Sequence, residues 1–209
     1  MSTPRVTFYH APNSRSGGTR ALLEELGVDY DMHVLNFSKN EQRQPEYMAV
    51  NPMGKVPAIW HRGELVTEQP AVFIYLADLY PEKGLAPGLD DPLRGPYLRW
   101  MVFYGSCFEP ALVDRSMQRD PPKPSTCPYG DFDTMYNTLV SQLERGPYML
   151  GERFSALDVL WGNALYWMTM FKLAPELPVI RAYIDRVISR PAMQRAAAKD
   201  AELAAALAA

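Results

Sequence analysis

The spacing of hydrophobic residues changes along the first part of the chain. Apolar and polar residues alternate over residues 30–35, which is the period of a half-buried β-strand. Residues 5–9 form a short apolar run and also predict a strand. Between them, residues 19–26 have helical spacing and end at Gly27, a residue type favoured just past a helix end. Strand, helix and strand within about thirty residues predict a parallel βαβ unit.

Two more strands and a helix are predicted after this unit. Residues 56–60 and 65–66 flank the stretch His61-Arg62-Gly63-Glu64 and predict an antiparallel hairpin. Pro70 then begins a helical pattern that runs to Leu79, because proline is favoured in the first turn of a helix. This part of the chain is therefore expected to form a small α/β domain.

Helical spacing dominates the remainder of the chain. A long helix is expected from Pro92 onward, disturbed at Pro110, and residues 120–130 are expected to be a loop. The further predicted helices cover residues 131–145, 155–171, 178–189 and 192–206. The pattern predicts an α/β domain over residues 1–83, a linker rich in glycine, proline and aspartate over 84–92, and an all-helical domain over 93–209.

One predicted helix has a strong start signal. Ser155 is followed three residues later by Asp158, which is the spacing of a capping box, and Phe154 and Val159 occupy the flanking hydrophobic positions. The residues that follow are apolar nearly all round the helix, so this helix is expected to be the buried centre of its domain. We interpret the signal as structural.

Composition and charge exclude several function classes. The formal net charge of −3 argues against a nucleic-acid partner, which would require a basic face. The most apolar segment, residues 159–171, is interrupted by Gly162 and Asn163 and is too short to span a bilayer, so no membrane partner is expected. The first residues lack the apolar core of a signal peptide, which indicates a cytoplasmic protein.

The histidines and cysteines do not form a recognisable metal or redox motif. His10, His33 and His61 lie far apart without metal-ligand spacing, so no metal is expected. Cys107 and Cys127 are not in a C-x-x-C arrangement. We expect two free thiols, with a disulfide between them as the alternative.

Two short stretches are candidates for chemistry. Residues 10–18, HAPNSRSGG, follow a strand and precede a helix, where hydroxyl residues and glycines serve either a plain turn or a ligand site at a helix N-terminus. Pro57 either begins an edge strand or follows a cis bond. A cis Val56–Pro57 bond would turn the backbone N–H and C=O of Val56 outward, where an extended peptide ligand can pair with them.

With these stretches, the chain resembles the cytosolic glutathione transferase family over nearly its whole length. The resemblance rests on the N-terminal βαβ unit, NPMGKVPAI at 51–59, Thr67-Glu68-Gln69 before a helix, and FSALDV at 154–159. It implies a thioredoxin-like N-terminal domain followed by an all-α domain. It also implies glutathione as co-substrate, a homodimer, and a role in detoxification.

The resemblance assigns glutathione-binding roles to individual residues. Val56 would pair its backbone with the cysteinyl unit, with Pro57 cis, and Lys55 would lie by the glycyl end. Glu68 and Gln69 would hold the γ-glutamyl end, where free N–H groups at a helix start favour a carboxylate. The chain departs from the family in having Gln69 where serine is usual, and the adjacent proline removes one of those N–H groups.

The family activates the glutathione thiol with a donor near the end of the first strand. The resemblance makes Ser14 the first candidate here, together with Asn13, and Ser16 the next. Tyr9 is either a donor or a packed aromatic residue of the strand. Arg15 stands where some bacterial members have cysteine, and its guanidinium would also favour a thiolate.

The resemblance implies that the helical domain supplies a pocket for a small apolar electrophile. The candidate residues are Trp100, Phe103, Tyr104 and Phe108, and ordinary helical core accounts for most of them. The predicted activity is a glutathione transferase acting on such an electrophile or a peroxide. The alternatives are a glutathione-dependent isomerase or dehalogenase, and a non-catalytic binding protein of the same fold.

Overall fold

The structure, a computed structural model, describes residues 5–120 and 123–208, which divide into two compact units. One unit comprises the chain up to Leu76 together with the chain from Pro191 onward, and the other runs from Ala77 to Arg190. The hydrophobic pattern predicts one helical domain over residues 93–209. The chain from Pro191 onward instead packs with the N-terminal unit, because its helix lies against the first helix of the chain.

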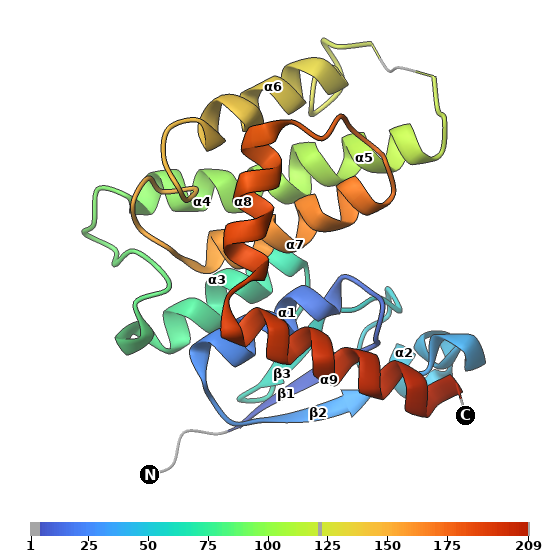
Figure 1. The fold of residues 1–209 in the computed structure, drawn as a ribbon. Helices are drawn as coiled ribbons and strands as arrows, with labels where there is room; N and C mark the ends of the chain where they lie inside the picture. Colours follow the sequence, from blue (N-terminus) through green and yellow to red (C-terminus); the bar gives the residue numbers. More distant parts are fainter. Residues whose placement is uncertain (1–4, 121–122, 209) are drawn as a thin grey trace. The chain divides into compact units, whose positions relative to one another are not determined.

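The first unit contains a four-stranded sheet with strand order β2-β1-β3-β4 (Figure 1). The strands are β1 (Val6–His10), β2 (Tyr30–Val34), β3 (Ala58–His61) and β4 (Glu64–Val66). β1 pairs with β2 in parallel and with β3 antiparallel, and β3 and β4 form an antiparallel hairpin. The predicted βαβ unit and hairpin are both confirmed.

The helices of this unit are α1 (Ser16–Leu26), the short α2 (Pro45–Met48), α3 (Gln69–Leu79), whose last residues belong to the second unit, and α9 (Pro191–Ala208), with 3-10 turns at Phe37–Lys39 and Glu41–Arg43. The predicted helices begin within three residues of the expected positions, whereas α2 and the two 3-10 turns are not predicted. α1 begins three residues earlier than predicted, because Gly17 and Gly18 carry no side chain that would show the helical period. It ends at Gly27, whose φ of 61° is the left-handed conformation that favours glycine.

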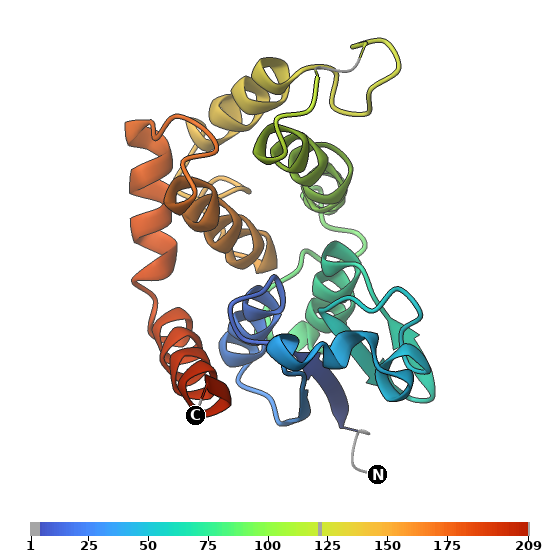
Figure 2. The same ribbon diagram turned by 90° about the vertical axis from the view of Figure 1, so that its right-hand side faces the viewer.

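α9 lies alongside α1 in both views of the ribbon (Figures 1 and 2). Its buried residues are Ala192, Met193 and Ala196, two of them small enough to let the helices approach closely. At the surface of the same contact, the Lys199 ammonium lies 2.5 Å from the Glu24 carboxylate. Apolar burial and this ion pair together hold α9 on α1.

The regular structure in the described residues of the second unit is helical, apart from two isolated β-bridges between residues 148 and 153. Its elements are a 3-10 turn at Pro81–Lys83, α4 (Arg94–Phe103), a π-helical turn at Tyr104–Phe108, α5 (Glu109–Ser116), α6 (Phe132–Leu143), α7 (Ala156–Met170) and α8 (Pro178–Ile188). The predicted disturbance near Pro110 is this π turn, since proline lacks the N–H that would continue the helical ladder.

α7 is the buried centre of the second unit, as the apolar pattern predicts. The capping box at its start is present, with the Ser155 N–H donating to Asp158 Oδ2 at 2.8 Å. Asp158 Oδ1 accepts from the Met149 N–H and from the Tyr183 hydroxyl, each at 2.8 Å. Burial raises the pKa of the Asp158 carboxyl to about 6, although these hydrogen bonds oppose the rise.

Candidate active site

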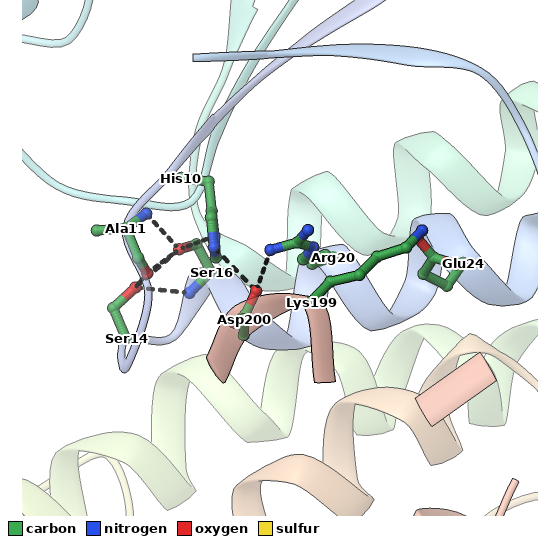
Figure 3. Close-up of polar contacts among 8 residues, drawn as sticks. All are labelled: His10, Ala11, Ser14, Ser16, Arg20, Glu24, Lys199 and Asp200. Carbon is green, nitrogen blue, oxygen red and sulfur yellow. Dashed lines mark hydrogen bonds and ion pairs between the residues drawn. The ribbon is translucent and has the colours of Figure 1, made fainter. Parts of the chain in front are cut away.

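The serine turn, residues 11–16, joins β1 to α1 and brings two hydroxyl groups together (Figure 3). The Ser14 hydroxyl donates to the Ala11 carbonyl at 2.7 Å and lies 2.7 Å from Ser16 Oγ. The N–H of Ser16 donates to Ser14 Oγ at 3.2 Å, and the N–H of Ala11 donates to Ser16 Oγ at 3.1 Å. Ser16 is buried and Ser14 is half-buried, so Ser14 is the hydroxyl that a ligand can reach.

The residues on either side of Ser14 are exposed. Asn13 has a φ of 57°, in the left-handed region that asparagine tolerates better than most residues. The Arg15 carbonyl accepts a hydrogen bond from the Gln69 side-chain amide at 3.0 Å. That bond ties the serine turn to the start of α3.

Tyr9 packs on the other face of the sheet from His10, because side chains alternate along a strand. Its ring lies against His33 and Tyr47, with centroid distances of 5.4 and 5.5 Å. The structure therefore gives Tyr9 the packed position that was the alternative to a donor. A role for its hydroxyl at a thiol stays a prediction.

The Val56–Pro57 peptide bond is cis, as the resemblance implies. Among the described residues, no backbone hydrogen bond includes the N–H or C=O of Val56. Its side chain packs against the buried cluster of Ala11, Leu35 and Tyr47, and Ala11 is the first residue of the serine turn. Unpaired backbone groups and the Ser14 hydroxyl are thus supported by the same cluster.

The segment before Val56 is held by hydrogen bonds and a close approach. The Lys55 carbonyl accepts from the Tyr47 hydroxyl at 2.6 Å and from the Asn51 amide at 2.9 Å. Gly54 has a φ of 58°, and a Cβ there would lie 2.6 Å from the Gln42 carbonyl oxygen, so only glycine fits. Lys55 itself is exposed.

The start of α3 lies beside the serine turn. Glu68 has a φ of 61° and its carbonyl accepts the first helical hydrogen bond, from the Val72 N–H at 3.0 Å. Gln69 is buried, and its amide reaches Arg15 as described above. The structure thereby brings Glu68, Gln69 and the serine turn together, and glutathione binding by these residues stays a prediction.

Three further residues complete a polar cluster that the sequence analysis does not single out as a site (Figure 3). His10 Nδ1 lies 2.9 Å from Ser16 Oγ, and His10 Nε2 lies 3.1 Å from Asp200 Oδ1 on α9. The second contact lies at ion-pair distance without the alignment of a directed hydrogen bond. Arg20 Nη1 donates to the same Asp200 oxygen at 2.5 Å.

Charge keeps the Asp200 carboxyl ionised. Burial raises its pKa, but the close contacts and charges of His10 and Arg20 outweigh burial and hold that pKa below its ordinary value. Gly17 allows the close approach, since a Cβ there would lie 3.1 Å from Asp200 Oδ2. No local signal marks Asp200 in the alanine-rich stretch around it, because its partners are distant in the chain.

The aromatic candidates for an electrophile pocket surround Trp161 of α7. The ring-centroid distances to Trp161 are 6.0 Å from Trp100, 6.4 Å from Phe103, 5.5 Å from Tyr104 and 4.9 Å from Phe108. All but Phe103 are buried, as is Trp161. These rings form core of the second unit, and binding of an electrophile by them stays a prediction.

The described residues contain neither a metal-binding cluster nor a membrane-spanning helix. Within residues 5–120 and 123–208, no group of three or more His, Cys, Asp or Glu side chains is placed to hold a metal ion. In the same ranges no helix is both long and apolar enough to cross a membrane. Cys107 and Cys127 are free thiols, as expected.

Comparison with known proteins gives consistent matches. A family model described as Glutathione S-transferase, N-terminal domain, matches residues 4–78. Glutathione S-transferase 1 of Schizosaccharomyces pombe is 38% identical over 202 residues, which covers 81% of this chain and 85% of that protein. Disulfide-bond oxidoreductase YfcG of Escherichia coli is 27% identical over 210 residues, covering 93% and 95%.

Solved structures agree with the fold described above. The crystal structure of a glutathione transferase from Methylococcus capsulatus superposes with a TM-score of 0.79 at 27% identity, covering 94% of this chain and 99% of that one. The match identifies the sheet and its helices as thioredoxin-like, followed by a helical region. The predicted fold class is confirmed.

Proposed function

The chain belongs to the glutathione transferase family, and from this premise we propose that it is a glutathione-dependent enzyme that activates the thiol of glutathione as a thiolate. The thiolate attacks a small apolar electrophile or a peroxide. Ser14 donates to the sulfur, Val56 pairs with the cysteinyl backbone, and Glu68 and Gln69 receive the γ-glutamyl end. Lys55 lies by the glycyl carboxylate.

The observation that carries this proposal is the position of Ser14 relative to Val56. The outward backbone of Val56 pairs with a peptide by adding a strand, and its side chain shares a cluster with Ala11. Ala11 in turn accepts the hydrogen bond of Ser14. A cysteinyl unit paired with Val56 therefore meets a half-buried hydroxyl, which donates to the sulfur once its proton turns away from the Ala11 carbonyl.

A hydroxyl donor at the sulfur promotes the reaction because the thiolate is the nucleophile. Hydrogen bonds to the charged form lower a thiol pKa, by one unit for each 1.4 kcal/mol or so of differential interaction. Ser14 lies at the N-terminus of α1, where the backbone N–H groups and the helix dipole also favour negative charge. Asn13 and the Arg15 guanidinium are exposed beside it and are secondary donors in this proposal.

The test is an ultraviolet difference titration of bound glutathione, which follows thiolate absorbance against pH. We expect a thiol pKa well below the free value of about 8.5. Ser14→Ala should raise it by about one unit or more, the usual worth of a hydrogen bond to a charged group. The exposed Ser141→Ala in α6 is the matched control. An unchanged thiol pKa in Ser14→Ala would remove the serine assignment.

The alternative activities of the family differ in whether they consume glutathione. A conjugating enzyme or a peroxidase consumes it, whereas an isomerase regenerates it, so a substrate panel that follows free thiol distinguishes them. A non-catalytic binding protein is favoured by one observation: the Gln69 amide already donates to Arg15. No glutathione binding at about millimolar concentration would support that alternative.

Assembly and location complete the proposal. By family membership we propose a homodimer in the cytoplasm that acts in detoxification. Sedimentation at micromolar concentration tests the first point, and a monomer there would contradict it.

A further inference from the structure

Four polar groups form a continuous chain from α9 to the serine turn (Figure 3). The successive distances are 3.1 Å from Asp200 Oδ1 to His10 Nε2, 2.9 Å from His10 Nδ1 to Ser16 Oγ, and 2.7 Å from Ser16 Oγ to Ser14 Oγ. We call this chain the relay. His10 and Ser16 have no exposed surface, and Ser14 at its end is half-buried. A ligand at the serine turn therefore meets the relay at Ser14.

The carboxylate sets the direction of the relay when His10 is neutral. An ionised Asp200 beside Nε2 favours a proton on that nitrogen, which leaves Nδ1 as an acceptor. Ser16 then donates its hydroxyl proton to Nδ1, and Ser16 Oγ accepts from the Ala11 N–H. To complete the relay, Ser14 turns its hydroxyl proton from the Ala11 carbonyl to Ser16 Oγ, each of which lies 2.7 Å from Ser14 Oγ. In this state the hydroxyl protons run inward, toward His10.

Resting on the proposed function, we propose that His10 receives the proton of the glutathione thiol through Ser14 and Ser16. The S–H bond breaks and its proton passes to Ser14 Oγ. Ser14 passes its own hydroxyl proton to Ser16, and Ser16 passes its own to His10 Nδ1. Both serines end as neutral hydroxyl groups. The products are a thiolate and an imidazolium, so charge and protons balance without another reactant.

The transfer also reverses the hydrogen bonds of the relay. Protonated His10 donates from Nδ1 to Ser16, Ser16 donates to Ser14, and Ser14 donates to the thiolate. The same groups that remove the proton then stabilise the charge that is left. Asp200 faces the imidazolium at Nε2 and stabilises it.

The charged groups around His10 couple its protonation to the thiolate. Arg20 on α1 already neutralises Asp200, at 2.5 Å from the same oxygen. Lys199 and Arg195 of α9 are paired with Glu24 one turn further along, and Tyr30 of β2 is the nearby phenol. The Asp200–Arg20 pair that faces His10 therefore carries no net charge before glutathione binds. The thiolate supplies the negative charge that balances the imidazolium.

The number of protons released to solvent on glutathione binding distinguishes this relay from a His10 that only packs in the core. Near neutral pH a free thiol that becomes a bound thiolate releases about one proton to solvent. With the relay, His10 keeps that proton. We expect glutathione binding to the whole protein to produce thiolate absorbance with much less than one proton released per thiolate, measured by calorimetry in buffers of different ionisation enthalpy.

Nitrogen NMR of the histidine rings provides a second measurement that needs no variant at the site. The chain has three histidines, and His33→Asn, an exposed residue of β2, assigns one signal and serves as the matched control. We expect the His10 ring to be singly protonated without glutathione and doubly protonated in the complex. A ring that stays neutral while thiolate forms would overturn the relay.

Variants then interrupt the relay at separate points. His10→Asn and Ser16→Ala should each release about one proton for every thiolate that still forms. Asp200→Asn should raise the pKa of the bound thiol by about one unit, because the imidazolium loses its carboxylate. Its affinity for S-methylglutathione, which has no thiol proton, should stay unchanged. Equal losses of affinity for both ligands would assign Asp200 a structural role and overturn its part in the relay.

The outcomes also separate this inference from the proposed function. If the wild-type protein binds glutathione as a thiolate and releases a full proton, the proposed function stands and the relay is wrong. If no thiolate absorbance appears in the wild-type complex, the proposed function fails and the relay fails with it.

Discussion

Two carboxyl groups, the buried Asp158 and the half-buried Asp200, have pKa values that shift in opposite directions. Asp158 has no exposed surface and no cationic partner in its hydrogen bonds, so burial dominates and raises its pKa to about 6. Asp200 is also partly buried, but His10 and Arg20 more than offset its burial and lower its pKa. The Asp158 carboxyl accepts hydrogen bonds that hold the start of α7, whereas the Asp200 carboxyl stays charged next to the His10 ring.

The Asp158 shift predicts a measurable dependence of stability on pH. A carboxyl whose folded pKa lies above its unfolded value of 3.8 stabilises the protein fully below that value, and the contribution is lost as pH rises to about 6. The rise corresponds to about 3 kcal/mol. We expect the free energy of unfolding of the wild type, relative to Asp158→Asn, to decrease by up to this amount between about pH 4 and pH 6.

Urea unfolding across this pH range checks the prediction. The exposed Asp185→Asn on α8 is the control, because it changes the same functional group without removing a buried one. A difference between wild type and Asp158→Asn that stays constant or increases with pH would contradict the interpretation of Asp158.

At the scale of the element, α9 is the helix whose place the sequence does not predict. Its existence follows from helical spacing and alanine content, as do the strands and the other helices. Which element a helix packs against, and which of its faces is buried, depend on tertiary packing. The partners of Asp200, for example, are His10 and Arg20, which lie far away in the chain. For the same reason the sequence indicates Ser14 and Val56, whose signals are local, but not the relay.

The contact of α9 with α1 should depend on its buried small residues. Ala196 is 4% exposed, so Ala196→Asp would bury an unpaired charge and should weaken the contact by about 3 kcal/mol. The neighbouring Ala197 is exposed, and Ala197→Asp should change stability by less than about 0.5 kcal/mol. Amide hydrogen exchange of α9 measures both. Equal protection in the two variants would show that the buried face of α9 does not hold it.

At the scale of the whole molecule, the two compact units differ in whether their chain is continuous. The first unit is built from two separate stretches of chain, and the second from one continuous stretch, Ala77 to Arg190. Composition and pattern predict two parts, an α/β part and a helical part, and this much is confirmed. The boundary after α8 is not predicted, because α8 and α9 have the same helical pattern and are separated by only two residues, Ser189 and Arg190.

In native-state hydrogen exchange with increasing denaturant, amides of the same unit should lose protection together, even where they lie far apart in the sequence. We expect α9 to lose protection together with β1 and α1, and α8 to lose it together with α7, because contacts within a unit open as a group. Ser189 and Arg190 would then mark a step in protection between two successive helices. If α9 exchanges together with α8, the division into units is wrong.

The discontinuous first unit also has a consequence for biosynthesis. A ribosome delivers the sheet and the serine turn first, then all of Ala77 to Arg190, and only afterwards the helix that carries Asp200. During translation His10 therefore lacks the Asp200 carboxylate until the entire second unit has been made. A nascent chain is expected to present Ser14 and Val56 long before it can complete the relay, so the full lowering of the thiol pKa comes only after α9 has emerged and docked.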